Sequence, residues 1–271
     1  MRSLSLVTGQ SYRKRTTVAS EYVMAGVFVT RGMTWGTPGV VISLDEAGKP
    51  VAGNMAIQVH FDVGPTWLQI ALHHLEDSKV KQLERIEAWK GTNQKAKAAA
   101  LEGEFETSMQ AIMAAAIAID AFYAVVQTKT KLPAHLITSW RAKKTARYAQ
   151  ICEVLRLAFS LRPQATRVLR QNLRAIYKLR DKAIHPTGKL EAPVLHPELQ
   201  VGVEWRFSDF RFENAYLVVR ETLNMLCELV TSGKPQNSGV LKYAEAVRPK
   251  LEKFKKAEVL AKHPHPVRPA Q

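Results

Sequence analysis

The chain has 271 residues, of which 46% are hydrophobic and 23% are charged, and this composition excludes an intrinsically disordered or collagen-like protein. Lysine and arginine outnumber aspartate and glutamate by 39 to 24, which gives a net charge of +15. The expected partners are therefore polyanions, such as RNA or an anionic membrane surface, and a solvated basic surface is the alternative. The length allows one large domain or two small ones with a real core.

The chain contains two cysteines, Cys152 and Cys227. Both fall within helical patterns, which favours reduced core thiols and a cytoplasmic protein. The first residues lack the apolar segment of a secretory signal. The apolar run 109 to 126 is rich in alanine and contains Asp120, so we interpret it as a buried helix and expect no membrane span.

Residues 1 to 75 are predicted to form a β-rich N-terminal region. The segment 22 to 72 contains β-branched runs and alternating apolar and polar residues, separated by turn residues at 45 to 50. We interpret Trp67 to Leu72 as its last strand. The simplest arrangement is a small antiparallel sheet in the form of a meander.

Residues 76 to 233 are predicted to form a helical domain. Its first helix covers 75 to 89, with Leu83 and Ile86 on one side and charged residues on the other. A long helix follows, from about 94 to 126.

A third helix is predicted over 140 to 161, and a fourth between Pro163 and Pro186, where no residue breaks the helical pattern. The fourth helix has an apolar face that consists of Leu169, Leu173, Ile176, Leu179 and Ala183. Its opposite face is a basic row of Arg167, Arg170, Arg174 and Lys178. The basic row either follows the backbone of a nucleic acid or is a solvated face.

A loop insertion is predicted at 188 to 210, with an extra strand near 200 to 208 that pairs with the N-terminal sheet. A final helix covers 213 to 231, and 234 to 271 is a basic C-terminal segment with a short helix and a loose tail. The two histidines of the His-Pro-His-Pro tail are too isolated for a convincing metal site, so we expect no metal and no other cofactor.

Arg180 departs from the basic row, because it falls on the apolar side of its helix. An unpaired buried charge costs several kcal/mol, so this guanidinium needs an anionic partner. Asp120 is the expected partner, since it is the single carboxylate between residues 107 and 128. His185 precedes Pro186, which ends the helix and lets the imidazole turn back towards Arg180.

An acidic residue in the helical stretch AIAIDAFYAVV is followed by two helices, the second of which ends in LRDKAIHPTG. This succession resembles the HEPN family, whose name refers to higher eukaryotes and prokaryotes nucleotide-binding. The resemblance covers roughly residues 94 to 232 and leaves out the N-terminal sheet. Many HEPN proteins are metal-independent ribonucleases with an R-x4-6-H motif, and here that motif falls on Arg180, Asp181 and His185.

The resemblance also implies how such a protein would work. Two protomers would meet with their motifs facing each other and build one composite site. RNA would be cleaved to a 2′,3′-cyclic phosphate and a 5′-hydroxyl. A toxin or defence role is typical of the family, and an antitoxin or regulatory protein would then be a further partner.

Metal-independent cleavage needs a base for the 2′-hydroxyl, an acid for the leaving oxygen and a cation for the charge on phosphorus. His185 is the candidate base or acid, because histidine titrates near neutrality. Arg180 presents a planar fork that matches phosphate oxygens, and Asp181 could orient Arg180 or His185. Tyr177, one turn before Arg180, could stack on a base.

Each of these residues has a purely structural alternative. Arg180 and Asp120 could form an ion pair that only holds the helices together. His185 could be a helix cap that interacts with the dipole. Asp181 could pair with a neighbouring lysine, and Tyr177 could be an interfacial residue without a catalytic role.

We therefore predict an α+β protein in which a small N-terminal antiparallel sheet joins a HEPN-like helical bundle. It would be a cytoplasmic homodimer that cleaves RNA endonucleolytically without a metal. The alternative is a non-catalytic HEPN-like module that binds nucleotides or nucleic acid, or that serves as an assembly surface. A DNA-binding regulator is a weaker candidate, because no recognition helix or zinc framework is evident.

Overall fold

The structure is a computed structural model, and it describes residues 28, 30, 33–36, 42–44, 46–52, 58–185 and 188–261. The described part is mostly helical and carries small antiparallel strand pairs, which confirms the coarse α+β prediction. The predicted elements before residue 28 and the tail with His263 and His265 lie outside the described residues.

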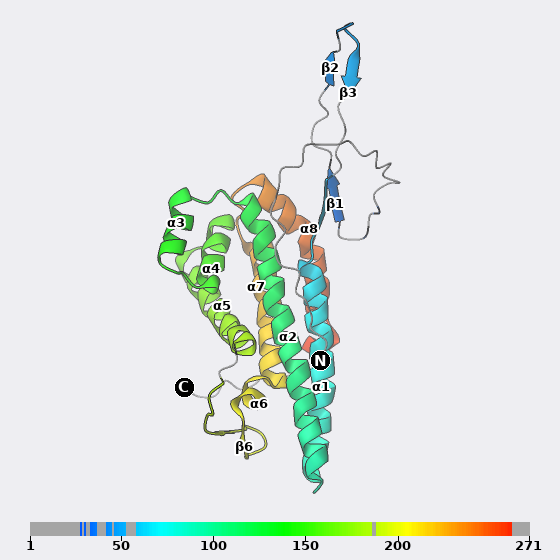
Figure 1. Cartoon of the computed structure of the whole chain (residues 1–271), viewed down its shortest axis with the longest axis vertical. Helices are drawn as coiled ribbons and strands as arrows, with labels where there is room; N and C mark the ends of the chain where they lie inside the picture. The colour runs from blue at the N-terminus through cyan, green and yellow to red at the C-terminus, as the bar shows by residue number, and fades with distance from the viewer. Residues whose placement is uncertain are drawn as a thin grey trace, which may run out of the picture.

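The two longest helices, α1 (Gly64–Lys90) and α2 (Gln94–Lys129), lie side by side along the molecule (Figure 1). Pro65 stands in the first turn of α1, where its missing N–H needs no partner. Asn93 caps α2 by accepting hydrogen bonds from the N–H groups of Lys95 and Ala96. Buried positions recur at spacings of three and four, as in a coiled coil: Leu68, Ala71, Leu75, Ser78, Gln82 and Arg85 on α1, and Glu104, Ser108, Ala111, Ala115, Ala118 and Phe122 on α2.

Two predictions for this region are wrong. The expected strand Trp67 to Leu72 belongs to α1, because its apolar residues continue into a helical pattern, and a short apolar run alone does not distinguish strand from helix. The expected apolar side of the first helix faces solvent, since Leu83 and Ile86 are 54% and 42% exposed. Polar side chains occupy the buried side there instead, and Ser78 and Ser108 share a hydrogen bond of 2.6 Å across it.

By length and composition α2 could cross a membrane, and 56% of its most apolar window is buried inside the protein. The core helix of a soluble protein meets the same criterion. The helix packs against α1, α4, α5 and α7, and Ile112, Ile119 and Phe122 are at most 2% exposed. These contacts agree with the prediction of a buried core helix.

The core is completed by α7 (Phe212–Ser232) and α8 (Ser238–Lys255), which pack on each other and on α1 and α2 (Figure 1). The predicted final helix coincides with α7. The basic segment after it is more helical than predicted, because it holds α8 and the short α9 (Glu258–Ala261). Both cysteines are buried free thiols, as expected.

A second lobe consists of α3 (Ala134–Ala142), α4 (Arg147–Ala158) and α5 (Pro163–Ile184) (Figure 1). The predicted single helix 140 to 161 is wrong, because the chain turns between α3 and α4, where Lys144 has a φ of 47°. The fourth predicted helix is confirmed as α5. Its buried face includes Leu169, Leu173 and Ile176, while the basic row is exposed.

The strands form three antiparallel pairs within the described residues. One pair is β1 (Met33–Gly36) with β4 (Gln58–Phe61). The pair β2 (Ile42–Leu44) with β3 (Pro50–Ala52) lies between them in the sequence. The first strand therefore pairs with the last, which contradicts the predicted meander.

The third pair is β5 (Val194–Leu195) with β6 (Gly202–Val203), so the predicted extra strand is two residues long and does not join the N-terminal strands. The last four residues of the predicted range 200 to 208 belong to α6 (Trp205–Asp209). The side chain of Glu204 starts α6 by accepting a hydrogen bond from the N–H of Arg206. Alternating apolar residues predicted a strand, but the helix cap decides the local structure.

Candidate functional site

The carboxyl end of α5 holds Arg180 between a carboxylate and an aromatic ring. Its Nη1 lies 3.7 Å from Oδ1 of Asp181, and its guanidinium carbon lies 5.0 Å from the centre of the Tyr177 ring. The Arg180 side chain is 24% exposed, so it is partly shielded but still reaches solvent. The two neighbours orient the guanidinium, and its remaining donors can bind an oxyanion.

Asp181 lies close enough to Arg180 to orient it, and this role stays a prediction. Its alternative partner Lys182 pairs with Asp209 of α6 and lies over the ring of Trp205, 4.7 Å from its centre. The contacts of Lys182 connect the end of α5 to the insertion that follows it.

His185 is the residue at which α5 ends. Its N–H donates a hydrogen bond of 2.9 Å to the carbonyl oxygen of Asp181, while its ψ of 70° leaves the helical region. The prediction that His185 is released from the helical register is confirmed. The side chain is exposed, so the backbone caps the helix while the imidazole remains available to a ligand.

Asp120 pairs with Arg147 and not with Arg180, so the predicted partner is wrong. Nε of Arg147 donates a hydrogen bond of 2.8 Å to Oδ1 of Asp120, and its guanidinium lies 4.3 Å from the centre of the Tyr123 ring. The reason is the break between α3 and α4, which makes Arg147 the first residue of α4 and brings it to α2.

Tyr177 connects these two arginine sites. Its side chain is buried, and its hydroxyl has no partner with hydrogen-bonding geometry among the described residues. Burial raises the pKa of this hydroxyl, the nearby Asp120 carboxylate raises it further, and Arg147 and Arg180 oppose the rise. The ring supports Arg180 and has no free face for the base stacking that we expected.

The residues that surround Tyr177 form one half-exposed group, which we call the outer cluster. Its members come from α2, α4 and the end of α5: Asp120, Arg147, Tyr177, Arg180 and Asp181. His185 follows at the C-cap of α5.

A basic groove of about 690 Å³ lies between α4 and α5. Three members of the basic row line it, Arg167, Arg170 and Arg174, while Lys178 does not. Within the described part of the chain, none of the three has a carboxylate partner, which leaves their guanidinium groups for a ligand. Arg156 of α4 faces them but is held by both oxygens of Glu153.

The helices α4 and α5 run antiparallel, so the beginning of α4 lies near the end of α5, where the outer cluster is. Near the beginning of α5, the Cys152 thiol donates a weak hydrogen bond of 3.7 Å to the carbonyl oxygen of Thr166. Near its end, Arg147 acts electrostatically on Tyr177. The basic row thus extends along α5 towards Arg180.

A second polar site escaped prediction. Arg85 of α1 is 1% exposed and binds both Glu104 of α2 and Glu198 of the loop after β5. Glu104 also accepts a hydrogen bond of 3.1 Å from the N–H of Phe212, so it fixes the beginning of α7. We call this site the inner cluster, which consists of Gln82, Arg85, Glu104, His196, Glu198, Arg211 and Glu213.

Two residues of the inner cluster have shifted pKa values. Burial and the neighbouring Glu198 raise the pKa of Glu213 to about 7, whereas burial and the charge of Arg85 lower the pKa of His196 to about 4. His196 is therefore neutral near pH 7, and its Nδ1 accepts hydrogen bonds of 3.3 Å from the N–H groups of Glu198 and Leu199. The cluster holds the 188–204 loop against the bundle.

The sequence did carry a signal for this site. Arg85 and Glu104 continue the three- and four-residue spacing of the buried positions on α1 and α2. A charged residue in such a register indicates a buried ion pair.

No protein-family model, no curated protein and no solved structure matches the chain.

Proposed function

We propose that the protein is a metal-independent RNA endonuclease of HEPN type, with Arg180 and His185 as its catalytic residues. The observation that supports this proposal best is the end of α5. There Asp181 and Tyr177 orient a half-exposed guanidinium, and an exposed histidine follows at the helix cap. A phosphate bound by Arg180 and a histidine that can act as base or acid would then lie at the same end of α5.

The cleavage begins when the 2′-hydroxyl of a ribose attacks the adjacent phosphorus. A base removes its proton, an acid protonates the leaving 5′-oxygen, and Arg180 stabilises the charge on the nonbridging oxygens. One His185 serves as base or as acid, and a second copy of the chain would supply the other group. The products are a 2′,3′-cyclic phosphate and a 5′-hydroxyl.

The basic groove gives the RNA a path to this site. Arg167, Arg170 and Arg174 present guanidinium groups along α5, and such groups bind phosphates in a sequence-independent way. The net charge of +15 favours the same polyanionic substrate. A toxin or defence role in the cytoplasm, controlled by an antitoxin or regulatory protein, rests on the HEPN resemblance alone.

The test is cleavage of a mixed RNA pool in EDTA by the wild-type protein and by His185→Ala, with the product ends identified. We expect cyclic-phosphate ends from the wild type and none from the variant, although both are folded. Mixed dimers of Arg180→Ala and His185→Ala should regain activity if two protomers share a site. Cleavage that survives in His185→Ala would overturn the assignment.

The second candidate is a non-catalytic module that binds nucleic acid. The basic groove favours it, because the groove needs neither His185 nor Arg180 to hold a phosphate backbone. In that case neither the wild type nor His185→Ala would cleave RNA, and both would bind RNA equally well. Arg170→Ala would then weaken binding and reduce its dependence on salt concentration.

A further inference from the structure

A second cavity, of about 320 Å³, lies where α2 ends and the chain turns from α3 into α4. Its volume is at the small end of the range for small-molecule sites, about 300–1,000 Å³. It could therefore enclose one nucleotide but no longer piece of RNA. The lining residues are Tyr123, Gln127, Ile137, Trp140, Arg141, Lys144, Thr145, Arg147 and Gln150.

The lining combines the groups that recognise a nucleotide. Arg141, Lys144 and Arg147 are cationic, and no lining residue is acidic. Trp140 is partly buried against the core, and its indole offers a surface for a base. In addition, no side chain caps the amino end of α4 at Ala146, so the first N–H groups of that helix favour an anion.

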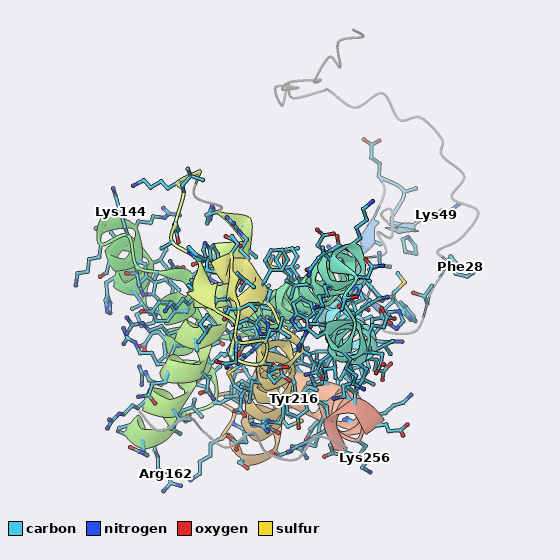
Figure 2. All side chains as sticks on the ribbon, turned by 90° about the horizontal axis from the view of Figure 1, so that it is seen from below. Phe28, Lys49, Lys144, Arg162, Tyr216 and Lys256 are labelled. Carbon is cyan, nitrogen blue, oxygen red and sulfur yellow. The ribbon has the colours of Figure 1, made fainter. Side chains whose placement is uncertain are left out.

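Lys144 has an unusual backbone position beside this cavity. The N–H of Lys144 binds the carbonyl oxygen of Arg141, and the N–H of Thr145 binds that of Trp140, at 3.3 Å and 3.0 Å. These two bonds form a Schellman motif, in which the left-handed position usually holds glycine. The chain has lysine there, with a φ of 47°, and Lys144 lines the cavity. Figure 2 shows Lys144 at the outer side of the α3–α5 lobe.

We propose that this cavity binds one nucleotide of the RNA substrate, with its phosphate at Arg141, Lys144 and Arg147 and its base against Trp140. The proposal rests on the proposed function, because it gives the catalytic end of α5 a neighbouring substrate site. The connection runs through Arg147, which binds Asp120 close to Tyr177, and Arg180 lies over the Tyr177 ring.

Calorimetric titration of full-length His185→Ala, which should not cleave its ligand, tests the site. The probes are uridine 5′-monophosphate, adenosine 5′-monophosphate and a short single-stranded RNA. Lys144→Gly should weaken mononucleotide binding about tenfold, as expected for the loss of one charge-assisted hydrogen bond. It should also raise the midpoint of thermal unfolding, since glycine adopts a positive φ freely, so weaker binding could not be due to misfolding.

Lys256→Gly is the matched control. Lys256 also stands at a helix end and is exposed, but it lies on the opposite side of the molecule (Figure 2) and has a φ of −87°. We expect this variant to bind mononucleotides as tightly as its parent. Equal binding by Lys144→Gly and its parent, or no binding at millimolar concentration, would overturn the site.

The RNA probe distinguishes a site for one nucleotide of an RNA substrate from a site for free nucleotides. Displacement of the mononucleotide by RNA supports a substrate subsite, whereas simultaneous binding of both would overturn it in favour of a site for free nucleotides. The cleavage assay is independent of this titration. If the wild type does not cleave RNA but Lys144-dependent binding is present, the proposed function fails and the nucleotide site stands. If the wild type cleaves RNA but Lys144→Gly binds mononucleotides as tightly as its parent, the proposed function stands and the nucleotide site fails.

Discussion

The inner and outer clusters contain the same kinds of side chain in opposite surroundings. In the inner cluster Arg85 and Glu104 are 1% and 2% exposed, and each has further hydrogen-bonding partners. In the outer cluster Arg147 and Asp120 are 41% and 27% exposed, and Arg180 keeps donors free for a ligand. The comparison teaches that burial, and not residue type, separates the ion pairs that hold this fold from those that can bind a substrate.

The largest effect that we predict is on stability and comes from the inner cluster. Glu104→Ala leaves the Arg85 guanidinium buried without its main partner and removes the acceptor for the N–H of Phe212. The free energy of unfolding should fall by about 3–5 kcal/mol, measured by urea denaturation.

The control for this prediction is Asp120→Ala, which breaks the corresponding pair of the outer cluster. Because that pair is half-exposed, its loss should cost less than about 1 kcal/mol. Equal losses of unfolding free energy in the two variants would mean that burial does not make the inner pair more important for stability than the outer pair.

The next largest effect is on catalysis and comes from the outer cluster. Arg180→Lys keeps the positive charge but loses the planar fork that matches two phosphate oxygens. We expect the cleavage rate to fall about 10²-fold, with unchanged stability, in a single-turnover assay. Arg174→Lys in the basic groove is the control, since a phosphate contact there needs only charge. An Arg180→Lys variant as active as the wild type would exclude a bidentate role.

The sequence predicted α2, α5 and α7 well because each has a clear helical period and an evident boundary. It also predicted the exposed basic row and the release of His185 from the helix, which follow from periodicity and from the proline after His185. These features are local, so neighbouring residues determine them.

The sequence failed where distant residues decide the outcome. Leu83 and Ile86 looked like the inner face of the first helix, but Arg85 lies inside because Glu104 and Glu198 meet it there. Similarly, Asp120 pairs with Arg147 only because the chain turns at Lys144, and a left-handed position is not expected at a lysine. Pairing across the bundle could not be derived from spacing along the chain.

A smaller effect should appear as a pH dependence of the inner cluster. The pKa of Glu213 is raised to about 7 from 4.5, so the folded state holds its proton more tightly than the unfolded state does. The stability from this group is present below about pH 4.5 and is lost as the pH rises towards 7. Glu198 acts in the opposite sense, because Arg85 and Arg211 overcome the effect of its burial and lower its pKa.

Glu213→Gln isolates the contribution of Glu213, since glutamine can still accept the hydrogen bond from Gln82 and does not titrate. The wild type should lose about 1–3 kcal/mol relative to this variant between pH 5 and pH 8, measured by urea denaturation at both values. A constant difference between the two proteins would show that Glu213 does not titrate in this range.

The smallest predicted effect concerns Tyr177, whose hydroxyl is buried in the outer cluster. Because this hydroxyl has no partner of hydrogen-bonding geometry, Tyr177→Phe removes no hydrogen bond and should change the free energy of unfolding by less than about 0.5 kcal/mol. The ring under Arg180 remains, so cleavage should also be nearly unchanged. A loss of more than about 1 kcal/mol, measured by urea denaturation, would mean that the hydroxyl binds the Asp120 carboxylate that raises its pKa. In that case Asp120→Asn and Tyr177→Phe would have non-additive effects, and the outer cluster would be a connected network from Arg147 to Arg180.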